Sequence, residues 1–220
     1  MHESSTVGAS TGVTGGRKVG RKPAFTAADV VAAAIAEGVD RFTLAAVAQR
    51  LGVVTPAIYR LFPSRDDLVV ACLDAAAATL RIPSVDDDWR AALRLWADEC
   101  WRVCEEYPGL SRLVYSYPTA FTRIDHVLSA YAEILGRSGR TPGQIMFALD
   151  FIGDTVFASH LGVESMRAAD ESGASGLDRV RGALDEDAAL QPEDSWADRG
   201  FVDRKVDFII AGLERDWPSL

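Results

Sequence analysis

Residues 43–68 read TLAAVAQRLGVVTPAIYRLFPSRDDL, and the helix starts and stops in this stretch decide the fold of the N-terminal region. From Leu44 onward, apolar residues recur at i, i+3, i+4 and i+7, so they share one face of a short helix that Thr43 can cap. Gly52 supplies the permissive backbone that ends a helix. The stretch therefore predicts two short helices joined by a tight turn and followed at once by a third, which is the helix-turn-helix arrangement.

The second helix of this motif has the composition of a DNA recognition helix. Thr55 and Pro56 provide an N-cap and an N1 proline, and the helix is expected to run to about Leu61. A helix about 10–12 Å across fills a major groove about 12 Å wide, so its outward polar groups meet the DNA. Pro63 ends the helix, and Ser64 can cap the next one. The predicted DNA contacts are Thr43, Thr55, Pro56, Ala57, Tyr59, Arg60 and Arg65.

Three runs and one further residue carry a family resemblance: Leu51-Gly52-Val53, Ile58-Tyr59-Arg60, Phe62-Pro63-Ser64-Arg65 and Leu68. Over about residues 25–70 they resemble the DNA-binding domain of TetR-type transcriptional regulators. The resemblance implies phosphate contacts for Tyr59 and Arg65. It also implies an effector enclosed by the helices that follow, and a dimer in which the last two long helices pair with those of a second copy.

The charges of the chain are divided unevenly between its two parts. Residues 1–68 hold eight Lys or Arg against six Asp or Glu, or +2, whereas residues 69–220 hold fifteen against twenty-six, or −11. This division suits a protein that presents a basic face to DNA and turns an acidic one away. A chain of 220 residues with 48% hydrophobic content can also bury a substantial core. We therefore expect a reader domain over residues 25–70 and a helical body over residues 71–220 for effector binding and dimerisation.

Residues 1–24 are predicted to be a flexible basic arm, because they are polar and Gly-rich without periodicity. Such an arm can enter the minor groove, and the alternative is a solvated tail. The segment lacks the apolar centre of a signal peptide, and no run of the chain reaches the roughly 18 apolar residues of a membrane helix. We therefore expect a cytoplasmic protein with no membrane partner. The basic residues of the arm are Arg17, Lys18, Arg21 and Lys22.

Helical periodicity dominates the rest of the chain, and no stretch has convincing period-2 alternation, so the predicted fold is all-α. Residues 170–195 carry Gly, Ser and acidic residues and are interpreted as a loop with a helical turn or two. The helices are expected over residues 27–37, 65–80, 86–107, 110–117, 119–137, 142–169 and 195–215.

The helix that begins near Pro142 is apolar on nearly every side, so protein must cover all its faces. The final helix has a similar surplus of Phe and Ile. We therefore predict a homodimer through these two long C-terminal helices, with a twofold axis that matches a palindromic double-stranded DNA operator.

Two carboxylates interrupt this apolar helix. Asp150 and Asp154 sit four residues apart and share a face with Met146 and Phe157. One interpretation makes them the polar anchors of a ligand pocket suited to a cationic or hydroxyl-bearing effector. The alternatives are an acidic lip at the dimer edge and a structural ion pair between helices. The arginines considered for that ion pair are Arg102, Arg112 and Arg123.

Aromatic and polar side chains of the preceding helices complete a candidate pocket, although aromatic residues at helical spacing more often form plain core. Cys100 and Cys104 share a helical face, but free cysteines mostly behave as small buried hydrophobes. The predicted ligand-binding residues are Trp96, Cys100, Trp101, Tyr115, Tyr117, Phe121, His126, Asp150, Asp154 and Phe157.

These features predict a dimeric one-component transcriptional regulator, a repressor that a small molecule releases from its operator. The sequence lacks a Gly-rich phosphate loop, a metal-ligand cluster and a nucleophile with a placed base, so we expect no enzyme, no cofactor and no metal. The alternative function is a helix-turn-helix protein with an architectural role and no small-molecule ligand. The sequence does not indicate which effector, operator or genes are involved.

Overall fold

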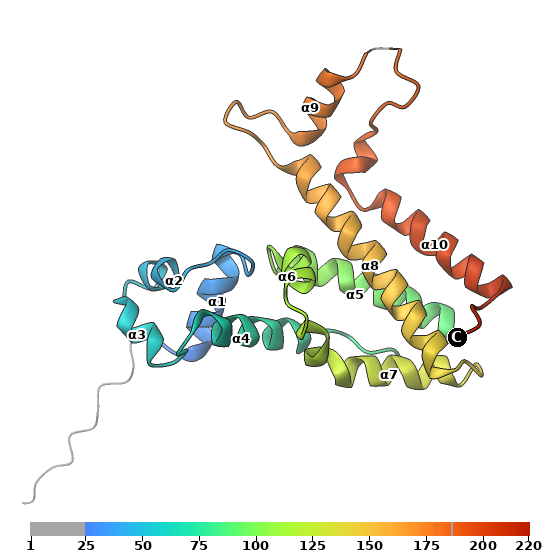
Figure 1. The fold of residues 1–220 in the computed structure, drawn as a ribbon, viewed down its shortest axis with the longest axis horizontal. Coiled ribbons are helices and arrows are strands. Elements are labelled where there is room, and N and C mark those ends of the chain that lie inside the picture. Colours follow the sequence, from blue (N-terminus) through green and yellow to red (C-terminus); the bar gives the residue numbers. More distant parts are fainter. Residues whose placement is uncertain (1–24, 186) are drawn as a thin grey trace, which may run out of the picture.

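The computed structural model describes residues 25–185 and 187–220, and these residues fold into helices (Figure 1). The only β-structure among them is an isolated antiparallel bridge between Ala169 and Ser175, so the prediction of an all-α fold is confirmed. The elements are α1 (Ala27–Glu37), α2 (Leu44–Arg50), α3 (Thr55–Tyr59), α4 (Arg65–Ala77), α5 (Trp89–Glu106), α6 (Leu110–Ser116), the 3-10 helix η1 (Ala120–Ile124), α7 (Asp125–Gly136), α8 (Pro142–Arg167), α9 (Gly176–Ala183), the 3-10 helix η2 (Asp194–Ala197) and α10 (Gly200–Arg215).

Short capping motifs start the helices that matter most for function. In each motif a hydroxyl accepts from the backbone N–H three residues on, while the side chain at that position accepts from the cap's own N–H. These reciprocal bonds satisfy donors that a helix N-terminus otherwise leaves free. The pairs are Thr26 with Asp29 before α1, Ser64 with Asp67 before α4, and Thr141 with Gln144 before α8.

Several predicted boundaries differ from the observed ones. The recognition helix starts at Thr55 rather than Pro56, so Val54 is its N-cap and the predicted capping role of Thr55 is wrong. The expected helix over residues 119–137 is divided into η1 and α7. The region predicted as a loop contains α9 and η2, and the last helix begins at Gly200.

The four N-terminal helices α1 to α4 pack around one apolar cluster, and we call α1, α2, α3 and the first half of α4 the reader. Val30, Val47, Ile58 and Leu68 are fully buried in this cluster. The same cluster continues into the helices that follow, through Val103, Tyr107, Leu110, Leu113 and Ala120. The reader is therefore attached to the rest of the chain by shared core as well as by α4.

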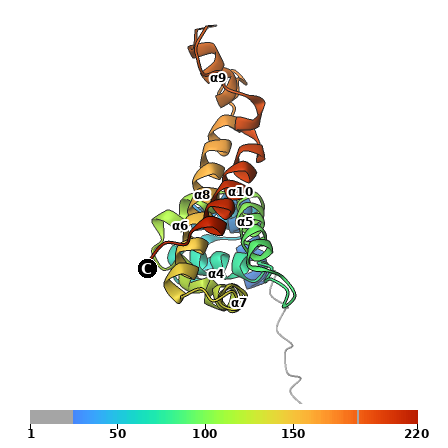
Figure 2. The same cartoon turned by 90° about the vertical axis from the view of Figure 1, so that its right-hand side faces the viewer.

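The helices α5 to α10 form the body, with α8 at its centre. Trp96 on α5 packs edge-on against Tyr131 of α7, with ring centroids 5.3 Å apart, and donates from Nε1 to the carbonyl of Leu149 at 2.8 Å. By length and composition, α8 is the one described helix that could also cross a bilayer, a test that core helices of soluble proteins pass as well. Here α8 packs against α5, α7 and α10. Figures 1 and 2 show α8 and α10 side by side, projecting beyond the other helices of the body, with α9 at the far end.

A buried carboxylate fixes the chain where α4 ends. The side chain of Glu99 on α5 is 0% exposed and accepts from the backbone N–H of Arg81 at 2.8 Å and from Nη2 of Arg102 at 2.6 Å. Arg102 also donates to the carbonyl of Thr79 at 2.7 Å, two residues after the end of α4. Burial by itself would raise the pKa of Glu99, but the hydrogen bonds from Arg102 and Arg81 outweigh it and lower the pKa to about 2. The ionised carboxylate is therefore part of the fold.

We predict that Glu99 stabilises the protein in a pH-dependent way. Its folded pKa lies below the ordinary value, so its stabilisation is complete above about pH 4.5 and is lost as the pH falls towards 2. A shift of this size is worth about 3 kcal/mol. Urea unfolding at pH 7 should show a loss of roughly that size in Glu99→Gln and a much smaller difference from wild type near pH 2. The exposed ion pair of Glu133 with Arg137 offers the control: Glu133→Gln should cost under about 0.5 kcal/mol at either pH.

Candidate functional site

The helix-turn-helix is built by α2, a tight turn and α3. The hydroxyl of Thr43 accepts from the N–H of Ala46 at 3.1 Å and caps α2, as predicted. In the turn, the N–H of Val53 donates to the carbonyl of Ala48 at 3.0 Å. Ile58 on α3 is fully buried in the reader core. These contacts hold α3 rigidly across α2.

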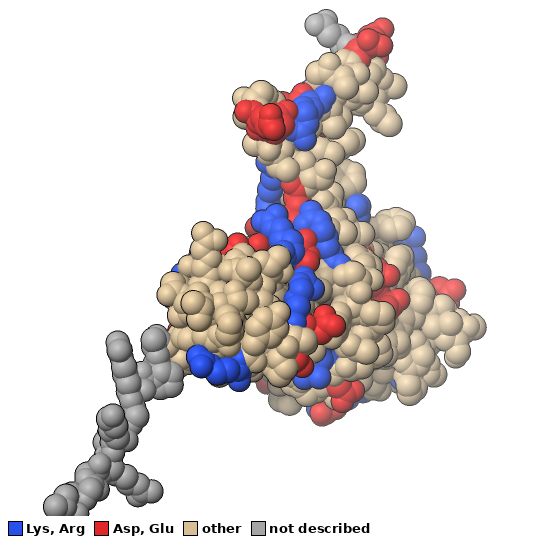
Figure 3. Space-filling model, turned by 60° about the vertical axis from the view of Figure 1, so that its left-hand side comes forward, with Lys and Arg blue, Asp and Glu red and all other residues tan. Residues whose placement is uncertain are grey.

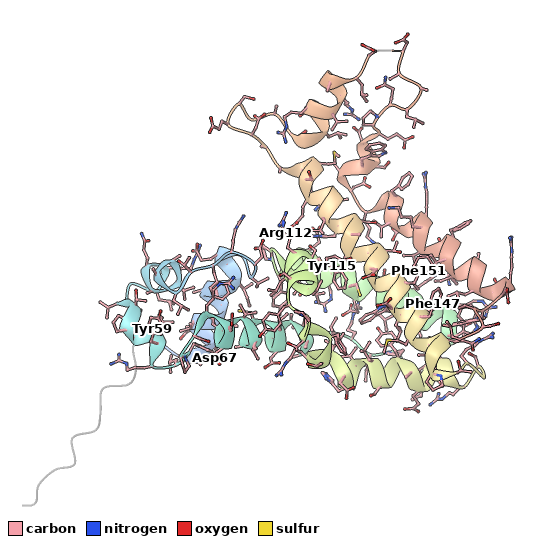
Figure 4. All side chains as sticks on the ribbon, viewed as in Figure 1. Tyr59, Asp67, Arg112, Tyr115, Phe147 and Phe151 are labelled. Carbon is pink, nitrogen blue, oxygen red and sulfur yellow. The ribbon has the colours of Figure 1, made fainter. Side chains whose placement is uncertain are left out.

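The outward face of α3 carries most of the predicted contact residues. Tyr59 is 51% exposed, Arg60 and Pro56 are also exposed, and Thr55 is half-buried. Ala57 is only 6% exposed because its methyl group packs inward, so its burial does not favour the predicted contact with DNA, which stays a prediction. In Figure 4 Tyr59 stands at the free edge of the reader, away from the body. A shallow groove brings together Thr43, Thr55, Tyr59, Ser64 and Arg65.

Arg65 has a structural role that the sequence did not reveal. Its Nε donates to the carbonyl of Phe42 at 3.1 Å and its Nη2 donates to the carbonyl of Asp40 at 2.8 Å. The guanidinium also lies 4.8 Å from the centre of the Phe42 ring. Arg65 thus ties the start of α4 to the loop before α2, and its contact with phosphate stays a prediction.

The charge on the reader is low on its outer face. On the face shown in Figure 3, Asp and Glu lie mainly over the body and the end that carries α9, while basic residues mark the lower edge of the reader and gather where the reader meets the body. The basic residues predicted for the arm, Arg17, Lys18, Arg21 and Lys22, lie outside the described residues.

The reader also meets the body through a polar contact away from the C-terminal end of α4. The loop before α2 places Asp40 beside Arg112 of α6, with 3.6 Å between Oδ2 and Nη1, and Arg112 continues to Glu164 of α8 at 3.1 Å. In the same place, the N–H of Val39 donates to the carbonyl of Pro108 at 2.8 Å. Arg112 therefore links the reader to the long central helix of the body (Figure 4).

The body encloses a cavity of about 470 Å³ between α4, α5, α6, η1 and α8. Its wall is mostly apolar, and one side of it comes from Leu73, Ala76 and Ala77 of α4 and from Leu80, three residues after the end of that helix. Eight of the predicted ligand-binding residues line it: Trp96, Cys100, Tyr115, Tyr117, Phe121, Asp150, Asp154 and Phe157.

Two predicted pocket residues lie elsewhere. Trp101 packs edge-on against the buried ring of His160, with centroids 4.9 Å apart, and His126 is exposed on α7. His160 in turn contacts Ser111 Oγ at 3.0 Å and Glu105 Oε1 at 3.1 Å, and burial lowers its pKa. The periodicity placed Trp101 on a buried face but did not say which buried face borders the cavity.

The structure also decides between the interpretations of Asp150 and Asp154. The three arginines considered as their partners are engaged elsewhere: Arg102 with Glu99 and Glu106, Arg112 with Asp40 and Glu164, and Arg123 with both oxygens of Asp74. Over residues 25–185 and 187–220, neither aspartate has an ion pair. A structural ion pair with those arginines is therefore wrong.

The polar surroundings of the two aspartates are sparse. The hydroxyl of Tyr115 donates to the backbone carbonyl of Asp154 at 3.2 Å, and burial followed by the charge of Asp154 raises the pKa of Tyr115 to about 12. Partial burial, and then the charge of Asp154, raise the pKa of Asp150. The thiol of Cys100 is fully buried, which raises its pKa well above the ordinary value and keeps it neutral. Within the described residues, no group of three His, Cys, Asp or Glu side chains is arranged to hold a metal ion.

The apolar character of α4 on two sides is the signal that sequence reasoning missed. Leu68 and Cys72 pack in the reader core, whereas Leu73 and Ala77 line the cavity. A helix that is apolar on two sides borders two interiors, so this pattern indicated a cavity on the far side of α4.

A capped helix-turn-helix shares helix α4 with a helical body that contains a cavity. This combination defines the class of the protein, which is a DNA-binding regulator. Residues 26–72 match the family model described as bacterial regulatory proteins of the tetR family. The match covers α1, α2, α3 and the first part of α4, so the N-terminal domain of the chain is of the tetR-family type.

Individual relatives agree with this assignment. The HTH-type transcriptional repressor DrrR1 of Streptomyces coeruleorubidus is 33% identical over 105 residues, which cover 45% of this chain and 39% of DrrR1. The match thus spans about two fifths of that relative's length. A possible TetR family transcriptional regulator from Streptomyces coelicolor A3(2) has the same fold, with a TM-score of 0.69 and 18% identity over 86% of this chain and 99% of that one. The S. coelicolor TetR family protein ActR, solved in complex with actinorhodin, gives a TM-score of 0.63 and 20% identity over 87% of this chain and 97% of its own.

We predict that the contact between reader and body depends on the absence of a side chain at position 109. Gly109 has φ +89°, and a Cβ there would lie 2.0 Å from Oδ1 of Asp40. Gly139 also has a positive φ of +79°, but a Cβ added there would meet nothing within 4 Å. Gly109→Ala and Gly139→Ala should both lose about 1–2 kcal/mol to the left-handed backbone, and Gly109→Ala should lose about 1–3 kcal/mol more by displacing Asp40 from Arg112. Equal losses in chemical denaturation would show that Asp40 moves aside at no cost.

Proposed function

We propose that the protein is a homodimeric repressor that leaves a palindromic operator when a small molecule occupies the cavity of the body. The observation that carries this proposal is the double role of α4. Leu68 and Cys72 on this helix belong to the core of the reader, while Leu73 and Ala77 line one wall of the cavity. A ligand that pushes on this wall acts on the element that holds the recognition helix.

The coupling between the two sites is mechanical. The start of α4 is held to the reader by Arg65, and its end is held to α5 through Glu99, so a shift of α4 is passed on as a rigid tilt. A coupling free energy of about 1–3 kcal/mol is typical of such pairs of sites. By reciprocity, operator DNA then weakens ligand binding by the same factor.

On DNA, α3 occupies the major groove. Tyr59 and the start of α4 contact phosphates and set the position of the helix, while Thr55 and Arg60 meet base edges. The basic arm adds contacts in the minor groove. In the bound dimer the two recognition helices lie about 34–36 Å apart, because a twofold dimer must meet successive major grooves on one side of the duplex.

The dimer forms through the outer face of the α8–α10 pair. Phe208 on α10 is 81% exposed, and Phe151 on α8 and Phe201 on α10 are also exposed on this face, where they line a shallow groove. Figure 4 shows Phe147 and Phe151 on the side of α8 next to α10. A second copy of the same helix pair is the occupant that buries these side chains symmetrically, because a twofold contact brings identical surfaces together.

The relatives support the repressor and ligand parts of the proposal. DrrR1 is named a transcriptional repressor, and ActR was solved in complex with actinorhodin. A one-component regulator of this kind works in the cytoplasm, where operator DNA and metabolites are both present.

The second candidate is an architectural DNA-binding protein without a ligand. The cavity favours the repressor, since about 470 Å³ lies within the roughly 300–1,000 Å³ of small-molecule sites, whereas a protein with no ligand gains nothing from an apolar void. A thermal-shift screen of lipophilic metabolites, run with and without promoter DNA, separates the two. Compounds that stabilise the free protein and release the DNA support the repressor, and their absence from a broad screen supports the architectural role.

We predict that Tyr59→Phe weakens DNA binding equally for all sequences, because a phosphate contact carries no base identity. The loss of one hydrogen bond to a charged group corresponds to about tenfold in Kd. Arg60→Ala should instead change the sequence preference. Binding titrations against a randomised operator library measure both effects. A changed sequence preference in Tyr59→Phe would show that the hydroxyl contacts a base edge. An unchanged sequence preference in Arg60→Ala would show that Arg60 contacts the DNA backbone.

We also predict that Phe208→Glu disrupts the dimer, because a carboxylate buried in the interface has no partner. Leu190 supplies a matched control, since it is 81% exposed like Phe208 but lies between α9 and η2. Sedimentation equilibrium should show at least a tenfold weaker dimer for Phe208→Glu and no change for Leu190→Glu. Equal dimerisation of both variants would place the interface elsewhere.

A further inference from the structure

The cavity wall contains a charge that the protein itself leaves uncompensated. Asp150 and Asp154 stand one helical turn apart on α8, and the described part of the chain offers neither of them an ion pair. Arg123 is the one cationic residue among the cavity-lining residues, and it binds both oxygens of Asp74 at 2.6 and 2.8 Å. The cavity therefore carries two adjacent negative charges on one wall.

The remaining polar groups of the wall are neutral or already satisfied. The indole N–H of Trp96 donates to the carbonyl of Leu149, and the hydroxyl of Tyr115 donates to the carbonyl of Asp154. The thiol of Cys100 stays protonated because burial raises its pKa. Tyr117 adds a hydroxyl group, and apart from these groups the lining is hydrocarbon and aromatic, including Phe121 and Phe157.

We propose that the ligand of this cavity is an amphipathic organic cation, with an aromatic or hydrocarbon frame in the apolar part and a protonated amine between Asp150 and Asp154. The inference rests on the proposed function, in which the cavity is the effector site. It deepens that function by naming the chemical class of the effector.

Electrostatics favours a cation over the other classes of ligand. Both aspartates are solvent-exposed where they border the cavity, so a neutral or anionic ligand seated against them displaces part of their water and supplies nothing in return. A protonated amine both replaces the lost water and screens the repulsion between the two carboxylates. The raised pKa of Asp150 reflects the same strain, caused by burial and then by Asp154.

An organic cation also fits better than a metal ion. Calcium takes six to eight oxygen ligands and magnesium keeps a near-ideal octahedron, whereas this wall offers two carboxylates amid apolar side chains. The volume of about 470 Å³ and its aromatic lining suit a molecule with fused rings.

Three ring compounds of similar shape and different charge test the inference on the full-length protein without DNA. At pH 8, 9-aminoacridine is a cation, acridine is neutral and anthracene-9-carboxylate is an anion. Calorimetric titration should rank the cation tightest and the anion weakest. Asp150→Asn and Asp154→Asn should each weaken the binding of 9-aminoacridine about tenfold. The same substitutions should change the affinity for acridine by no more than about twofold. Asp86→Asn, an exposed position outside the cavity lining, should change neither.

The outcomes separate this inference from the proposed function. If acridine binds as tightly as 9-aminoacridine, or if the anion binds best, the cationic effector is overturned while the cavity remains a ligand site. If none of the three binds to the folded wild-type protein, the role of the cavity as an effector site fails, and the cationic effector fails with it. If an Asn variant proves unstable in thermal unfolding, the ranking of the three compounds on the wild type still decides.

Discussion

The ionised side chain of Glu99 is the interaction on which the arrangement of the two parts depends. It is buried completely, and it accepts from the backbone and the guanidinium of Arg81, in the chain that follows α4, and from Arg102, which also donates to Thr79. Breaking a buried, hydrogen-bonded charge is far more costly than breaking a surface pair. The far end of α4 is consequently fixed to α5, while Ser64 and Arg65 fix its near end to the reader.

A helix held at both ends transmits a displacement, and a second connection limits the directions in which it can do so. Asp40, Arg112 and Glu164 join the reader to α6 and α8, on the side remote from the end of α4. Two separate attachments restrict rotation of the reader about a single hinge. The bidentate pair of Arg123 with Asp74 then couples η1, which borders the cavity, to the middle of α4. In the proposed function, this pair gives movement of the cavity wall a route to the reader.

Local chemistry in the sequence predicted most of the helices, because a cap is decided by three or four adjacent residues. Thr26, Thr43, Ser64 and Thr141 mark their helix starts as expected. The start of α3 was misplaced by one residue, since Thr55 can either cap or join the helix and the packing of Ala57 and Ile58 decides. The short elements η1 and α9 were not resolved, as each depends on tertiary contacts more than on periodicity.

Residues of the candidate site could be predicted from the sequence where a charged residue stood in an apolar stretch. Asp150 and Asp154 were conspicuous in an apolar helix, and the cavity contains both. Trp101 and His126 were misplaced, because helical phase gives the direction of a side chain but not the neighbour it meets. The contacts of Arg112 join residues separated by tens of positions, and no local pattern indicates them.

The two walls of the cavity have different roles, and this difference affects how the sequence of such a protein can diverge. Residues on the α4 wall serve two interiors, so a substitution there alters DNA reading and ligand fit together and is constrained twice. The α8 wall, with Asp150, Gly153 and Asp154, faces the cavity without entering the core of the reader. In the proposed function, substitutions on α8 can therefore change which molecule is sensed while the DNA sequence that is read stays the same, and this separation makes the fold readily adaptable to new chemical signals.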